Sequence, residues 1–105
     1  TPVAQEVRTA RGAEAKYLIA ECHYHLEDPD NAEEIIMSFT KQQTSHQYWL
    51  AKSLILLADI NVKRNELFQA KQYLLALQKN YRVQEDDIQT IIKDKLELIA
   101  QMDIQ

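Results

Sequence analysis

Apolar residues recur at intervals of three and four positions along most of this chain, which is the spacing of an amphipathic helix rather than of a strand. Five stretches carry the pattern, and residues that favour helix ends lie between them. The predicted helices cover about residues 2–26, 29–42, 45–64, 66–81 and 85–103. The chain is therefore predicted to be all-α, with short connections between its helices.

Several predicted helix ends carry residues that satisfy free backbone groups. Asp28 can cap a helix whose first residue is Pro29, because proline lacks an N–H that the first turn would leave unpaired. Thr44 and Gln47 fit a capping box at the start of the third helix. The acids at 85–87 are predicted to open the last helix, where negative charge complements the helix dipole.

The predicted helices differ in how much of their surface is apolar. The third is apolar over more than half of its circumference, as expected for a helix packed on both sides. The second is predicted to bury Ala32, Ile35, Ile36 and Phe39; the fourth, Phe68, Ala70, Leu74, Leu75 and Leu77; and the fifth, Ile88, Ile91, Ile92, Leu96, Ile99 and Met102.

A pattern of small and aliphatic residues occurs twice, 38 positions apart, as from Ala32 to Ala70. The first copy reads Lys16-x2-Ile19-Ala20-x2-His23 with Ala32-x3-Ile36, and the second reads Leu54-x2-Leu57-Ala58-x2-Asn61 with Ala70-x3-Leu74. This resembles the tetratricopeptide repeat, W-x2-L-G-x2-Y followed by A-x3-F, in which small residues let two antiparallel helices approach closely. The residues predicted to pack the repeats are Ala20, Ala32, Ile36, Leu57, Ala58, Ala70 and Leu74.

Longer stretches of sequence extend the resemblance. They are Arg11-Gly12-Ala13-Glu14-Ala15-Lys16-Tyr17-Leu18, His46-Gln47-Tyr48-Trp49-Leu50-Ala51, Leu56-Leu57-Ala58-Asp59-Ile60, Phe68-Gln69-Ala70-Lys71-Gln72-Tyr73-Leu74 and Asn80-Tyr81. Over roughly residues 8–100 the chain resembles the C-terminal repeats of large tetratricopeptide proteins of Bacteroides and related bacteria. The resemblance implies antiparallel helix-turn-helix repeats stacked as a right-handed solenoid, with no known enzymatic activity.

On this basis residues 1–105 are predicted to form one domain. Repeat 1 spans about 2–42, repeat 2 about 45–81, and a closing helix about 85–103. The 38-residue spacing exceeds the usual 34, and Thr44 and Arg82 stand where the repeat's last proline is expected. The chain begins with Thr1 rather than Met, which suggests a piece of a longer protein.

The resemblance also implies a ligand groove, lined by the first helix of each repeat. The implied positions are Glu14, Tyr17, Glu21, Tyr24 and His25, and Lys52, Ile55, Asp59, Val62 and Lys63. Tyr17, Glu21 and Tyr24 also share one face of a helix by their spacing of i, i+4 and i+7. Tyrosines among carboxylates suit a peptide with basic and apolar side chains. The alternative is that these stripes pack on a neighbouring helix.

Composition and charge narrow the possible functions. At 105 residues and 46% apolar content, the chain can bury one core but not two. A net charge of −4 with acids and bases interspersed argues against nucleic acid as a partner. The sequence contains no apolar run of about 18 residues, so no membrane span is predicted. A single cysteine leaves the redox compartment open, and nothing in the sequence indicates a cellular location.

A small group of metal-ligand residues lies near the end of the first predicted helix. Cys22 and His25 are three positions apart and could share a zinc ion, with His23 and His46 as other candidates. The spacing indicates no third or fourth ligand. The alternative is packing, because Cys22 takes a repeat position that is often small and buried, and His23 takes that of the packing tyrosine. We therefore expect neither metal nor cofactor.

Signatures of catalysis are missing from the sequence. One glycine cannot form a phosphate-binding loop, and no Ser, Cys or His comes with a recognisable acid partner. The acids between 27 and 34 lack the turn glycine and the terminal glutamate of a calcium loop, and they fit the start of a helix better. The chain is therefore predicted not to be an enzyme.

Two functions fit these expectations. The first is a protein- or peptide-binding scaffold, and the second is a purely structural cap or self-association segment of a longer solenoid. A polar outer face on the fifth helix would favour a cap, and Gln89, Lys93, Lys95, Glu97 and Gln101 are predicted to supply it. An uncovered first repeat should promote self-association through the exposed repeat end. A third possibility is a helical fragment of an enzyme whose active site lies elsewhere.

Overall fold

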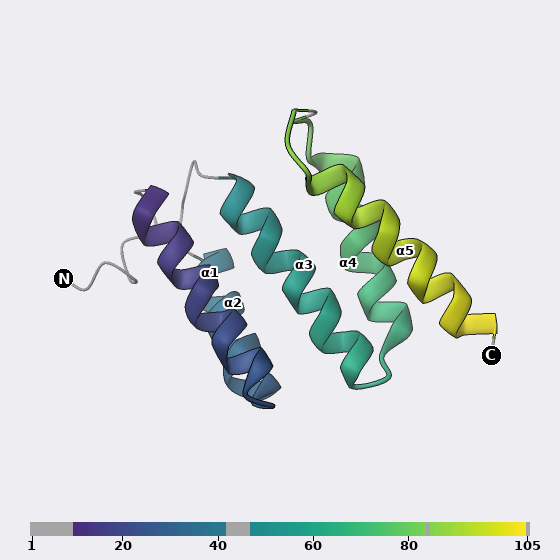
Figure 1. Cartoon of the computed structure of the whole chain (residues 1–105), viewed down its shortest axis with the longest axis horizontal. Coiled ribbons are helices and arrows are strands. Elements are labelled where there is room, and N and C mark those ends of the chain that lie inside the picture. The colour runs from purple at the N-terminus through teal and green to yellow at the C-terminus, as the bar shows by residue number, and fades with distance from the viewer. Residues whose placement is uncertain (1–9, 42–46, 84, 105) are drawn as a thin grey trace. The chain divides into compact units, whose positions relative to one another are not determined.

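The computed structural model describes residues 10–41, 47–83 and 85–104, and within these ranges the chain is all-α (Figure 1). The helices are α1 (Ala10–His25), α2 (Pro29–Lys41), α3 (Gln47–Lys63), α4 (Leu67–Asn80) and α5 (Ile88–Ile104). The predicted fold class is confirmed. The predicted helix start near residue 2 and the capping-box residue Thr44 lie outside the described residues.

The chain divides into two compact units, one through Ser53 and one from Leu54, so that the division falls within α3. In the first unit α1 packs along α2, and in the second α4 packs along α5. The solenoid arrangement stays a prediction.

The turn between α1 and α2 follows the Schellman pattern of helix ends. The N–H of Asp28 donates to the carbonyl of His23 at 2.9 Å, and the N–H of Glu27 donates to the carbonyl of Tyr24 at 3.2 Å. Glu27 has a φ of 61°, the left-handed conformation that this motif requires. The carbonyl of Asp28 then accepts the N–H of Ala32 at 3.2 Å. Asp28 thus bonds the last turn of α1 through its N–H and the first turn of α2 through its carbonyl.

The turn between α3 and α4 repeats this arrangement 38 residues later. The N–H of Glu66 donates to the carbonyl of Asn61 at 2.7 Å, and the N–H of Asn65 donates to that of Val62 at 2.9 Å. Asn65 also has a φ of 61°, and the carbonyl of Glu66 accepts the N–H of Ala70 at 3.1 Å. The two hairpins are therefore built on the same backbone turn, at the spacing that the sequence pattern shows.

The start of α5 corrects one expectation. The helix begins at Ile88, so the acids at 85–87 precede it rather than form its first turn. The carboxylate of Asp86 accepts the N–H of Ile88 at 3.0 Å and the hydroxyl of Tyr81, while the carbonyl of Asp87 accepts the N–H of Ile91 at 3.0 Å. These acids satisfy backbone donors from outside the helix.

The small residues of the repeat pattern lie in the core. The seven positions predicted to pack the repeats are each at most 1% exposed: Ala20, Ala32, Ile36, Leu57, Ala58, Ala70 and Leu74. In the first unit, Ala13 and Phe39 form a buried cluster on which Trp49 and Leu50 pack. In the second, Ile88, Ile92 and Ile99 are the buried side of α5.

Three aliphatic or aromatic residues predicted to face inward are exposed. Phe68 is 71% exposed, because it lies two residues before the buried Ala70 and therefore about 200° away around the helix. Leu75 and Met102 are exposed as well. Among the other predicted core residues, Ile35, Leu77, Ile91 and Leu96 are half-buried.

Candidate functional site

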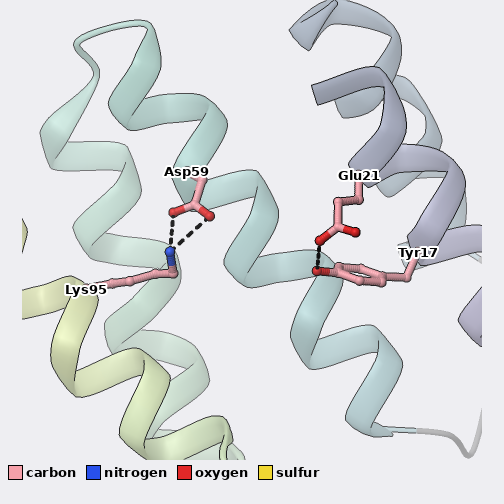
Figure 2. A network of polar contacts seen from close by, with 4 residues as sticks. All are labelled: Tyr17, Glu21, Asp59 and Lys95. Atoms are coloured by element: carbon pink, nitrogen blue, oxygen red, sulfur yellow. Dashed lines mark hydrogen bonds and ion pairs between the residues drawn. The ribbon is translucent and has the colours of Figure 1, made fainter. Parts of the chain in front are cut away.

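Tyr17 of α1 is the centre of the predicted groove in the first unit, and its ring is covered rather than open. Its side chain is 8% exposed, and its hydroxyl donates to a carboxylate oxygen of Glu21 at 2.9 Å (Figure 2). Trp49 of α3 lies with its ring centroid 5.7 Å from that of Tyr17, and Lys52 places its Nζ 5.5 Å from the Tyr17 centroid. This is the geometry of a cation–π contact.

Tyr48 completes the aromatic cluster at the start of α3. Its ring lies 5.0 Å from that of Trp49 in an edge-to-face arrangement, and Lys52 Nζ is 6.0 Å from its centroid. Tyr48 and Trp49 were not among the predicted groove residues. The signal that could have found them is their place one helical turn before Lys52, which puts them on the same side of the helix.

The accessible part of the α1 stripe consists of the remaining predicted residues. Glu14, Glu21 and Tyr24 are half-buried, and His25 is exposed. The rings of Tyr24 and His25 meet edge to face at 5.4 Å. Two carboxylates, of which that of Glu21 accepts the Tyr17 hydroxyl, and two ring side chains thus lie on one helix.

In the second unit one residue of the predicted groove, Asp59, is paired with a residue of α5. Lys95 Nζ donates to both carboxylate oxygens of Asp59, at 2.8 and 3.1 Å (Figure 2). The two side chains are 32% and 27% exposed, respectively. Burial raises the pKa of Asp59 above its ordinary value, and the hydrogen bond and charge of Lys95 oppose that shift.

This ion pair corrects two expectations. Asp59 is not an open groove residue, and Lys95 is not part of a polar outer face. Ile55 on the same stripe is 4% exposed, while Val62 is half-buried and Lys63 exposed. For Asp59, the alternative in which the stripe packs on a neighbouring helix is therefore the one that the structure shows.

The turn into α2 holds a second polar cluster. The carboxylate of Asp28 accepts the side-chain amide of Asn31 at 2.7 Å and lies 3.2 Å from Nδ1 of His23. The pKa of Asp28 is lowered, chiefly by the hydrogen bond from the Asn31 side chain. Desolvation opposes this shift, and His23 and the Asn31 backbone each add a smaller lowering effect. The cluster thus favours a charged carboxylate at the N-terminus of α2.

An open polar hollow of about 450 Å³ lies on the flank of this hairpin. Lys16 Nζ donates to the Ser38 hydroxyl at 3.2 Å within it. The lining residues are Lys16, His23, Asn31, Glu34, Ile35 and Ser38. Lys16 bonds Ser38, and His23 and Asn31 both contact Asp28, so most polar groups of the lining are already engaged and the hollow defines no ligand chemistry.

The candidate metal ligands are not brought together. Cys22 is exposed, His23 is engaged with Asp28, and the ring of His25 meets that of Tyr24 edge to face. Within the described residues, no three His, Cys, Asp or Glu side chains form a group that could hold a metal ion. His46 lies outside these residues.

Asn61 occupies the position in α3 that His23 occupies in α1, 38 residues earlier. Its side chain is 5% exposed, and its Nδ2 has no hydrogen-bond partner. The equivalent His23 contacts Asp28, whose own counterpart Glu66 makes no side-chain cap bond. The second hairpin therefore lacks the polar contact that secures the first.

No protein-family model, curated protein or solved structure matches this chain. Of the helices in the described ranges, none has the length and apolar character needed to cross a membrane.

Proposed function

We propose that this chain is a tetratricopeptide-like repeat module that binds a protein or peptide partner and catalyses no reaction. The observation that carries the proposal is the helical hairpin built twice on the same Schellman turn, 38 residues apart. Repeats of this kind expose the same helix face in each copy, and that face is what repeat proteins use to hold extended partners. The buried small residues at equivalent positions, such as Ala20 and Ala58, support the same assignment.

The α1 stripe supplies the partner chemistry. Glu14 and Glu21 give it negative charge, and Tyr24 and His25 give it ring surfaces. A peptide with alternating basic and apolar side chains matches this combination, because its cations meet the carboxylates while its apolar groups contact the rings. The second unit adds less, because Lys95 already neutralises Asp59.

The fluorescence of Trp49 gives a direct assay, since the chain has one tryptophan and its ring lies beside Tyr17. The titrants are peptides that alternate arginine with leucine, and a matched set in which glutamate replaces arginine. We expect binding of the basic set alone, weakening with added salt. A chain that binds neither set, or binds both equally, contradicts the proposed partner chemistry.

Removal of the charges tests the site itself. Glu14→Gln with Glu21→Gln keeps the side-chain size and leaves an acceptor for the Tyr17 hydroxyl, so the fold should be retained. We expect affinity for the basic peptides to fall by about tenfold. Glu97→Gln on the exposed side of α5 is the control, and an equal loss there would show that only net charge matters.

A structural cap is the second candidate. Lys93, Glu97 and Gln101 make the outward side of α5 polar, as the last helix of a stack requires. A chain that binds no peptide, yet loses cooperative unfolding when α5 is removed, fits a cap better than a binding module.

A further inference from the structure

The outward side of α1 is apolar, which is unusual for a helix that faces solvent. Leu18 is 44% exposed, Ile19 38% and Leu26 75%, and Cys22 between them is exposed too. At about 100° per residue these side chains and Ala15 fall within one arc of the helix, opposite the buried Ala20. A helix that is apolar on both sides is normally covered on both.

The internal repeat shows how the protein uses this face. The residues 38 positions after Leu18, Ile19 and Cys22 are Leu56, Leu57 and Ile60 of α3. Their exposures are 5%, 1% and 0%, so the face left open in α1 is fully covered in α3. The exposed stripe of α1 is therefore a packing surface of the repeat that no described residue of the first unit covers.

We propose that a second copy of this chain covers the stripe, with the two α1 helices packed antiparallel about a two-fold axis. Such an interface must be self-complementary. The order Ala15, Leu18, Ile19, Cys22 is small, large, large, small, and it has the same form in either direction. About a centre between Leu18 and Ile19, each large residue meets a large one and each small residue meets a small one.

Charge selects the antiparallel arrangement over the parallel one. In the antiparallel register, Arg11 at the start of α1 lies opposite Leu26 of the second copy. Its methylenes can cover that leucine while its guanidinium reaches the partner's Glu27 and the negative end of the partner's helix dipole. A parallel pair would instead place the two Arg11 side chains together.

The exposed side of α5 offers a less apolar surface, because the exposed Leu98 and Met102 lie among Lys93, Glu97 and Gln101. Stacking α1 on α5 of another copy would therefore bury charges against leucines. A closed dimer is therefore favoured over an open filament. The dimer does not depend on the peptide-binding face, because its residues differ from Glu14, Glu21 and Tyr24.

Sedimentation velocity across a concentration series tests the proposal. The parent is expected to pass from monomer to dimer and to stop there. Leu18→Glu should raise the dissociation constant by about tenfold or more, because it places a charge at the centre of the interface. Leu98→Glu is the matched control, since Leu98 is 55% exposed on α5 and should leave the dimer unchanged.

Three outcomes overturn the proposal: a parent that stays monomeric at the highest soluble concentration, assemblies that grow beyond two copies, or equal effects of the two substitutions. The first would leave a different partner or a preceding repeat to cover α1. Peptide binding measured on the same samples keeps this result separate from the proposed function.

Disulfide trapping tests the register without relying on a destabilising change. In the proposed dimer Cys22 lies opposite Ala15 of the partner, and the two Cys22 residues are about 10 Å apart along the helix axis. Mild oxidation should therefore cross-link Ala15→Cys efficiently and the parent poorly, because a disulfide requires Cα atoms within about 7 Å. A parent that cross-links as readily as the variant refutes the antiparallel register.

Discussion

Replacing Glu27 by glycine should stabilise the protein, although glycine usually weakens helical structure. Glu27 is the left-handed residue of the turn between α1 and α2, with a φ of 61°, and its side chain is exposed. A residue with a Cβ is strained in this conformation because the Cβ crowds the following carbonyl oxygen. Glycine has no Cβ, which is why it is the usual residue at this position of a Schellman turn.

The expected gain follows from two opposing effects. Relief of the left-handed conformation contributes about 1–2 kcal/mol. The greater backbone freedom of glycine in the unfolded chain costs about 0.5–1 kcal/mol. The net gain therefore lies between about 0 and 1.5 kcal/mol. Its midpoint of about 0.75 kcal/mol raises Tm by roughly 3–6 °C in a chain of this size. Asn65→Gly at the equivalent turn should gain less, since asparagine tolerates a positive φ.

Thermal and denaturant unfolding followed by circular dichroism measure this effect. Glu34→Gly is the matched control, because Glu34 is exposed within α2 and the same substitution there should cost roughly 0.5–1 kcal/mol. Measurements in about 1 M salt, where the Debye length is about 3 Å, screen the change in charge. If Glu27→Gly destabilises the protein as much as Glu34→Gly does, the proposed source of strain at the turn is refuted.

Three further predictions concern packing, the ion pair and its pH dependence. Ala20→Leu and Ala58→Leu should each destabilise the fold by about 1–3 kcal/mol, because these core positions leave no room for a larger side chain. In the same thermal unfolding measurements Ala76→Leu, on the exposed side of α4, should be nearly neutral. Lys95→Met should cost about 1–3 kcal/mol by leaving the Asp59 carboxylate half-buried without its partner, and restoration of stability by adding Asp59→Asn would confirm that reason. The pKa of Asp59 is raised in the folded state, so the carboxyl group should contribute most to stability in acid. Measured against Asp59→Asn, this contribution should fall as pH rises from about 3.9 through the folded pKa. A stability difference between the parent and Asp59→Asn that grows in the parent's favour with pH would contradict the direction of the shift.

Helix positions could be predicted from the sequence because the signals that set them are local. Pro29 begins α2 as expected, and α3 ends at Lys63, one residue from its predicted end. The burial of Ala20 and Ala58 was equally accessible, since a small residue repeated at the same place in two helices indicates a close crossing. The predicted start of α5 was three residues too early, because acids near a helix start can lie either before it or in its first turn.

The binding face was harder to predict, because a stripe on a helix has the same spacing whether it is open or covered. The spacing correctly placed Tyr17 and Asp59 on such stripes, but it did not predict which residues contact them. Tyr17 is closed by Trp49 and Lys52, and Asp59 is bonded by Lys95, which is 36 residues away in the chain. A stripe of polar residues therefore indicates a face of a helix without showing whether that face is free.

By itself the sequence of this protein determined the five helices, the 38-residue hairpin repeat and the small residues at its core. The tertiary structure alone decided that Asp59 would be neutralised by α5 and that Leu18 on α1 would stay exposed while its counterpart Leu56 is buried. The physical reason is that periodicity belongs to one helix and depends on residues within a few turns. Exposure depends on which other segments lie against that helix, and these come from distant parts of the chain.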